Sequence, residues 1–128
     1  MMKYLTLAAG GAIGTLLRYA VSGYTYNLLV GVFPWGTLTV NLIGSLLIGF
    51  LWGLFEIQNI SPEVRTFIFI GILGGFTTFS TFTLESLNLF REGEARLALI
   101  NILASNVLGI ALVFTGLAMS KALMNLLR

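Results

Sequence analysis

The feature that most limits what this chain can fold into is the stretch 97–119, in which no side chain carries a charge. About 20 consecutive apolar residues are enough for a helix to cross a bilayer, and three further stretches of the chain come close to that pattern. Charged residues make up only 9% of the sequence, against about 25% in soluble domains. We therefore predict an all-α integral membrane protein with four transmembrane helices.

A single transmembrane domain, residues 1–128, is expected, with helices at about 4–32, 37–55, 62–90 and 96–126. The Phe-Pro-Trp-Gly sequence at 33–36 separates the first two helices, since proline and glycine interrupt helices and tryptophan favours the membrane interface. Ser61 is expected to cap the third helix, with Pro62 in its first turn. The first helix should be retained rather than cleaved as a signal peptide, because three more spans follow it.

Lysine and arginine are divided almost equally between the two sides of the membrane. If four helices place both termini on one side, the basic residues on that side are Lys3, Arg65, Lys121 and Arg128. Those on the other side are Arg18, Arg91 and Arg96. Because this is almost no bias, the positive-inside rule gives no firm orientation. Either the chain inserts both ways and pairs with an inverted copy of itself, or a residue such as Arg18 is not a loop charge.

The composition argues against an enzyme. The sequence contains no histidine, cysteine or aspartate, which excludes Ser-His-Asp chemistry, thiolate or imidazole metal ligation and most general acid–base arrangements. A net charge of +2 is too small to indicate a nucleic acid partner. What remains is a transport or structural role in the membrane.

Residues 71–83 interrupt the third apolar span with three glycines, three phenylalanines and five hydroxyl side chains. Paired glycines weaken a helix interior, and a lipid-facing helix has no need of so many hydroxyls. Irregular backbone at membrane depth is tolerated only where protein buries it or where it lines a wet cavity. We therefore predict that the third helix is broken mid-membrane and that this break is the functional centre.

Two other helices carry a stripe of polar or small residues at four-residue spacing. The stripes contain Thr37, Asn41, Ser45 and Gly49 in the second helix, and Asn101, Ser105 and Gly109 in the fourth. Small residues let membrane helices approach closely. Such packing is the favoured interpretation of Ser45, Gly49, Gly109, Gly10 and Gly14. It is weaker for Asn41 and Asn101, whose amides need partners or water.

Phe79 and Phe82 share a helix face and alternate with hydroxyl side chains. The edges of aromatic rings are electropositive, so rings and hydroxyls together could bind a small anion without a fixed positive charge that would trap it. A path for water or a small solute would have a similar composition. Arg18 either snorkels to the membrane surface or supplies positive potential at a pore mouth. Glu85 either accepts hydrogen bonds from hydroxyl neighbours or lies near the membrane surface.

Three motifs in this sequence resemble those of a known family, the Fluc or CrcB fluoride channels. They are Gly-Gly-Ala-Ile-Gly-Thr-Leu-Leu-Arg-Tyr at 10–19, Gly-Thr-Leu-Thr-Val-Asn-Leu-Ile-Gly at 36–44 and Gly-Gly-Phe-Thr-Thr-Phe-Ser-Thr-Phe at 74–82. The third motif is highly specific, whereas the first two would be weak alone. With the length, the four spans and the weak charge bias, the likeness covers essentially the whole chain.

The resemblance implies an antiparallel, dual-topology homodimer with two pores in the cell inner membrane. It also implies passive, selective conduction that exports fluoride from the cytoplasm and relieves its toxicity. The implied partners are the fluoride ion, a second copy of the chain and the lipid bilayer, with no nucleic acid. A structural sodium ion (Na+) is implied at the dimer centre, held by the main-chain carbonyls of Gly74 and Thr77.

The resemblance carries site residues as well. It implies a fluoride pore lined by Phe79, Phe82, Asn41, Ser80, Thr81 and Ser105, with Arg18 in its vestibule. One position departs from the family: Asn101, four residues before Ser105, stands where many relatives carry a tyrosine. A tyrosine's role is therefore not transferred to it. Gly109 stands at the next position of the stripe, which is often serine in relatives.

Two alternatives remain open. A small four-helix, proton-coupled exporter would be similarly short and could also insert both ways, but it needs a carboxylate deep in the membrane, and Glu85 is the only candidate. A purely structural subunit of a larger complex is disfavoured, because packing alone would not require the hydroxyl-rich break. Transport driven by a pH gradient would distinguish the exporter from the channel.

Overall fold

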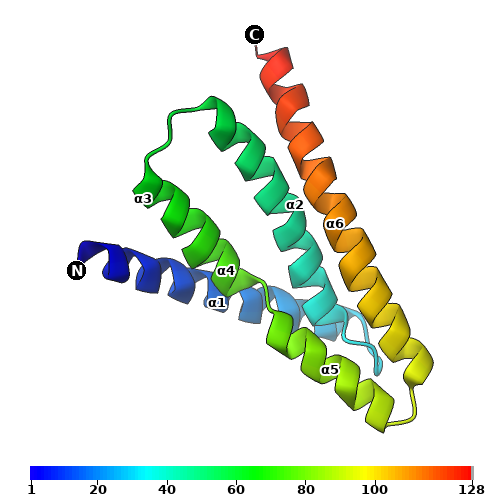
Figure 1. Ribbon diagram of the computed structural model, residues 1–128. Helices are drawn as coiled ribbons and strands as arrows, with labels where there is room; N and C mark the ends of the chain where they lie inside the picture. The colour runs from blue at the N-terminus through cyan, green and yellow to red at the C-terminus, as the bar shows by residue number, and fades with distance from the viewer. Residues whose placement is uncertain (128) are drawn as a thin grey trace.

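The computed structural model describes residues 1–127, and within them the chain forms helices and no strand (Figure 1). Four helical spans are long and apolar enough to cross a membrane: Met2–Leu28, Trp35–Ile57, Pro62–Arg91 and Ala95–Leu126. The predicted all-α fold with four spans is confirmed. Arg128, counted above among the basic residues, lies outside the described residues.

Three of the spans are single helices: α1 (Met2–Leu28), α2 (Trp35–Ile57) and α6 (Ala95–Leu126). The third span consists of α3 (Pro62–Arg65), the π-helix η1 (Thr66–Leu73), α4 (Gly74–Phe76) and α5 (Phe79–Arg91). In Figure 1 the chain leaves the helix between α4 and α5 and then continues in nearly the same direction. The third span is therefore one path across the molecule with an interruption in it.

The ends of two helices follow from local sequence. Helix α1 ends at Leu28 rather than at the expected 32, because Leu29 is extended (φ −115°, ψ 92°) and Gly31 has a positive φ of 148°, which glycine adopts without strain. Ser61 caps α3 as predicted: its side chain accepts a hydrogen bond from the Val64 N–H, and proline occupies the first turn.

Helices α2 and α6 lie side by side along most of their length (Figure 1). A Cβ added at Gly49 would lie 2.1 Å from the Val113 carbonyl oxygen, and one added at Gly116 would lie 2.2 Å from the Leu46 carbonyl oxygen. The two backbones therefore touch where each helix has a glycine, as is common between membrane helices. The packing interpretation of Gly49 is confirmed.

Helix α1 crosses the first half of the third span (Figure 1). A Cβ at Gly10 would lie 3.0 Å from the Gly71 Cα, and one at Gly14 would lie 2.1 Å from the Ile72 carbonyl oxygen. A side chain at Gly14 would therefore overlap backbone atoms, and one at Gly10 would make an unusually tight contact with them. The packing interpretation of Gly10 and Gly14 is confirmed.

The break in the third span does not fall at its paired glycines. Gly74 and Gly75 are helical, and a Cβ at Gly75 would lie 2.7 Å from the Gly11 carbonyl oxygen, so this glycine serves close packing on α1. The backbone is extended instead at Thr77 (φ −82°, ψ 159°) and Thr78 (φ −149°, ψ 123°). The predicted break of the third helix within residues 71–83 is confirmed, but the two residues that leave the helix are threonines and not the paired glycines.

Candidate functional site

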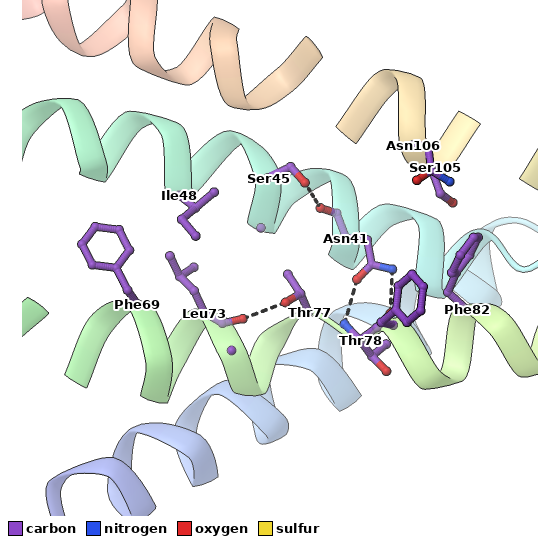
Figure 2. Close-up of a pocket in the computed structure, with 13 residues that line it drawn as sticks. Asn41, Ser45, Ile48, Phe69, Leu73, Thr77, Thr78, Phe82, Ser105 and Asn106 are labelled. Carbon is purple, nitrogen blue, oxygen red and sulfur yellow. Dashed lines mark hydrogen bonds between the residues drawn. The ribbon is translucent and has the colours of Figure 1, made fainter. Parts of the chain in front are cut away.

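The amide of Asn41 bridges the break in the third span. Its Oδ1 accepts a hydrogen bond of 2.8 Å from the Thr78 N–H, and its Nδ2 donates one of 3.0 Å to the Thr78 carbonyl oxygen (Figure 2). In hydrocarbon each unpaired backbone group costs several kcal/mol. One side chain from α2 therefore supplies hydrogen-bond partners for both backbone polar groups of Thr78, which lies outside the helices.

The hydroxyls of the two threonines complete the hydrogen bonding of the break. Thr77 Oγ1 donates to the Leu73 carbonyl oxygen at 3.0 Å, one turn earlier. Thr78 Oγ1 accepts from the Thr81 N–H at 3.3 Å and donates to Thr81 Oγ1 at 3.0 Å, so Thr78 is the N-cap of α5. The break is thus a defined turn between two helices.

Glycine on α2 makes room for the break. A Cβ at Gly44 would lie 2.2 Å from Thr77 Cγ2, so the methyl group of Thr77 occupies the space that a side chain at 44 would need. With its hydroxyl on Leu73 and its methyl on α2, Thr77 is held on both sides.

A cavity of about 340 Å³ opens at the break, between α2, the third span and α6 (Figure 2). It is lined by Asn41, Gly44, Ser45, Ile48, Phe69, Leu73, Gly74, Thr77, Thr78, Phe79, Phe82, Ser105 and Asn106. Hydroxyls, amides and aromatic rings therefore line the same cavity, and among the residues that the structure describes none of the lining side chains is charged.

The two phenylalanines of the third motif lie next to each other in this cavity wall but differ in exposure. Their ring centroids are 5.6 Å apart with an interplanar angle of 51°. Phe82 is 7% exposed, whereas Phe79 is 75% exposed in the single chain. Phe82 is therefore part of the folded core, whereas most of the Phe79 ring is exposed on the surface of the single chain.

The structure brings together four of the six expected pore residues. Asn41, Phe79, Phe82 and Ser105 line the cavity, from α2, α5 and α6. Ser80 and Thr81 are exposed and lie outside the lining. Arg18 is half-buried on α1, a helix that contributes nothing to the lining within residues 1–127. A hydroxyl contribution to the cavity comes from Ser45, which had been interpreted as a packing residue.

The carbonyl oxygens of Gly74 and Thr77 lack the partners that a continuous helix would supply. The N–H four residues after Gly74 belongs to Thr78 and donates to Asn41. The N–H four residues after Thr77 belongs to Thr81 and donates to the Thr78 hydroxyl. Neutral oxygens of this kind suit a hard cation, so these two residues fit the cation expected from the resemblance.

Glu85 lies apart from the main cavity. Its Oε1 accepts hydrogen bonds from Thr37 Oγ1 at 2.8 Å and from the Tyr26 hydroxyl at 3.0 Å. It borders a separate cavity of about 230 Å³ beside the link between α1 and α2. The expectation that hydroxyl neighbours hydrogen-bond this carboxylate is confirmed.

Two contacts at the site were missed from the sequence. The pairing of Asn41 with Thr78 was not foreseen, nor was the hydrogen bond of 3.0 Å from Asn101 Nδ2 to Ser86 Oγ. The available signal was that an asparagine inside an apolar span needs a partner. The sequence does not say which partner, because both contacts join residues on different helices.

This chain is similar to known proteins over nearly all of its length. Residues 5–117 match the profile of a family described as CrcB-like protein, Camphor Resistance (CrcB). A fluoride-specific ion channel FluC from Parabacteroides distasonis is 46% identical over 128 residues, covering all of both chains. One from Maridesulfovibrio salexigens is 44% identical, covering 98% of this chain and all of the relative. One from Salinibacter ruber is 50% identical, covering 91% of this chain and 87% of the relative.

Proposed function

The chain belongs to the CrcB-like family, and we propose that it is a fluoride-selective ion channel. The observation that carries the proposal is the uncharged cavity at the break, where two phenylalanine rings lie among hydroxyl and amide side chains. The relatives reported above are named as fluoride-specific ion channels, and none of these names describes an enzyme.

The lining explains how a small anion could pass without being held. An anion that leaves water has to regain hydrogen bonds, which the hydroxyl of Ser105 and the second N–H of the Asn106 amide can donate, whereas the Ser45 hydroxyl already donates to the Asn41 carbonyl oxygen. The electropositive edges of the rings of Phe79 and Phe82 add a weaker attraction. Since the lining supplies no full positive charge, binding is weak enough for the ion to leave again.

The working unit is an antiparallel homodimer with two pores. The nearly equal charge on the two sides supports insertion in both orientations. The 75% exposure of Phe79 supports a second copy as well, because a cavity-lining ring open on one side can be covered by an inverted neighbour. Each pore then lies along the cavity of one chain and is closed by the other.

A structural sodium ion joins the two chains in this proposal. The carbonyl oxygens of Gly74 and Thr77, whose usual helical donors bond elsewhere, would hold it, and two copies related by a twofold axis would supply four such oxygens. The ion would supply a fixed positive charge at the contact between breaks. The protein's own part is to engage the N–H groups of Thr78 and Thr81 with other acceptors.

Passive conduction sets the direction of flow. In the inner membrane of a cell with an inside-negative potential, the free energy of a monovalent anion falls by about 2.3 kcal/mol per 100 mV when it leaves the cytoplasm. A fluoride channel placed there therefore exports fluoride and lowers its toxicity without a coupled energy source.

Efflux from liposomes tests the function. Vesicles containing the purified protein and loaded with the potassium salt of fluoride or of chloride are diluted into medium without that anion, a potassium ionophore lets K+ leave with the anion so that charge balances, and release is followed with an ion-selective electrode. Fluoride should be released rapidly and chloride retained. Equal release of both anions would contradict fluoride selectivity, and fluoride release that requires an imposed pH gradient would favour the proton-coupled exporter, with Glu85 as its carboxylate.

A further inference from the structure

A chain of side-chain hydrogen bonds runs from the cavity wall into the contact between α6 and α5. Ser105, in the wall, donates its hydroxyl to Asn101 Oδ1 at 3.5 Å. Asn101 Nδ2 donates to Ser86 Oγ at 3.0 Å, and Ser86 Oγ donates to the Phe82 carbonyl oxygen at 2.9 Å. Asn101 is 1% exposed and Ser86 is 5% exposed, so solvent does not replace these partners.

The far end of this chain fixes the orientation of the asparagine. Ser86 has one hydroxyl hydrogen, and it lies on the Phe82 carbonyl. Ser86 Oγ can therefore only accept from Asn101, so the amide turns its NH2 group toward Ser86 and its Oδ1 toward Ser105. The Asn101 oxygen is a fixed acceptor beside the cavity.

Ser105 differs from most of the other hydrogen-bonded hydroxyls on the helices. Hydroxyls at five other positions donate to the carbonyl oxygen four residues earlier at 2.8–2.9 Å: Thr6, Thr25, Ser45, Ser86 and Thr115. Ser105 donates instead to the side-chain oxygen of the residue four earlier, over 3.5 Å. Hydroxyl hydrogen bonds are usually near 2.7–2.8 Å, so the hydrogen of Ser105 is only weakly held.

We propose that Asn101 is a positioning residue that keeps the Ser105 hydroxyl off the helix backbone and available as a donor to the anion in the cavity. Ser86 holds the asparagine in the orientation that this role needs. An anion entering the cavity takes a hydrogen held by a long bond at little cost, whereas a hydrogen held by a backbone carbonyl has to be released first. This inference rests on the proposed channel function.

Asn101→Leu tests the role, because leucine has a similar volume and no acceptor. The Ser105 hydrogen should then turn to the carbonyl oxygen of residue 101, as the other helical hydroxyls do. The fluoride concentration that gives half of the maximal single-channel current should rise about tenfold, the equivalent of one hydrogen bond, with little change in the maximal current. Ser86→Ala, which frees the amide, should give a smaller rise in the same direction.

Ser120→Ala is the matched control. Ser120 is a fully buried serine on α6 whose hydroxyl donates to the Leu117 carbonyl oxygen, and it lies outside the cavity lining. Its variant should keep the wild-type half-saturating concentration. A general loosening of α6 would raise the half-saturating concentration in the Ser120 variant as well as in the variants at 101 and 86. The proposed role raises it only in the variants at 101 and 86.

A double-mutant cycle decides whether Asn101 acts through Ser105. In a Ser105→Ala background, Asn101→Leu should cause no further rise, and additive effects would overturn the proposal. A wild-type half-saturating concentration in Asn101→Leu would also overturn it. If Asn101→Leu does not fold, Ser86→Ala with and without Ser105→Ala gives the same decision. A wild-type protein that passes no fluoride would overturn the proposed function itself, and this inference with it.

Discussion

The two halves of the third span use small and polar residues in opposite ways. The first half, from Pro62 to Phe76, is held on α1 by backbone contact at glycines, so that added Cβ atoms would lie 2–3 Å from backbone atoms. The second half, Phe79–Arg91, is held by side-chain hydrogen bonds to three other helices, through Glu85, Ser86 and the adjoining Thr78. One half is fixed by shape and the other by hydrogen bonding.

The difference explains where the uncharged, polar cavity lies. Backbone contact at glycines excludes water and leaves no polar group to face an ion. Hydrogen bonds between side chains hold helices farther apart, and they leave donors near the gap between them. The uncharged cavity therefore lies at the break, whereas the cavity of about 320 Å³ between the start of α1 and α3 is bordered by the charged residues Lys3 and Glu63.

The largest expected effect comes from removing the bridge between the two halves. Asn41→Leu leaves the Thr78 N–H and carbonyl without partners, which should lower the free energy of unfolding by about 2–6 kcal/mol for two unpaired groups and abolish fluoride release. Thermal unfolding in detergent and liposome efflux measure these effects.

Thr39→Val on the same helix is the control for this variant. Thr39 lies outside the cavity lining, so its loss should change neither stability nor efflux appreciably. Normal stability and efflux in Asn41→Leu would show that the break is held by its own backbone, and the contrast between the two halves would lose its basis.

A smaller effect tests the half held by shape. A Cβ at Gly14 would lie 2.1 Å from the Ile72 carbonyl oxygen, whereas a Cβ at Gly11 meets nothing within 4 Å. Gly14→Ala should therefore lower the free energy of unfolding by about 1–3 kcal/mol through overpacking, and Gly11→Ala should leave it unchanged or raise it slightly. Equal thermal stability of the two variants would refute backbone contact as the cause.

The sequence predicts the first half of the third span better than the second, because different kinds of contact hold the two halves. Four apolar spans, the Ser61 cap and the packing glycines Gly10 and Gly14 follow from local pattern, because length, capping and side-chain size are properties of neighbouring residues. The site depends on pairs such as Asn41 with Thr78, whose members lie on different helices. Sequence marks each amide as needing a partner but does not identify it.

The position of the break was the clearest limit of sequence reasoning. The sequence placed the break within residues 71–83, where paired glycines lower helix stability, but it did not show which of these residues leave the helix. In the structure these residues stay helical against α1, while Thr77 and Thr78 leave the helix. An amide from another helix supplies the hydrogen bonds of the extended segment, so the tertiary partner outweighs local propensity.

Substitutions of the two cavity phenylalanines, with a smaller expected effect, separate permeation from folding in the second half of the third span. Phe79→Ile and Phe82→Ile should each lower fluoride efflux between a few-fold and about tenfold, since aromatic contacts contribute about 0.5–1.5 kcal/mol, and neither should prevent the proposed dimer from assembling. Phe82→Ile should also lower thermal stability, and by more than Phe79→Ile, because Phe82 is 7% exposed within its own chain and Phe79 is 75% exposed.

Phe114→Ile serves as control, since Phe114 is exposed on α6 and outside the cavity lining. Its efflux should equal that of the wild type. Wild-type efflux in both cavity variants would remove the phenylalanines from the mechanism, and equal loss in all three would show a general effect of ring removal rather than a role of the cavity.

The smallest effect tests whether a region held by separate hydrogen bonds weakens step by step. Glu85 Oε1 accepts from both Thr37 and Tyr26, so Tyr26→Phe removes one donor and leaves the other. The free energy of unfolding should fall by about 0.5–1.5 kcal/mol, with efflux unchanged because neither residue lines the main cavity. Thr37→Val should act similarly, and the double variant should exceed either single one, since the carboxylate then lacks both hydroxyl donors. Complete unfolding caused by Tyr26→Phe alone would mean that the contacts of α5 break together and not one by one. The two halves would then differ in the kind of contact that holds them but not in the cooperativity of unfolding.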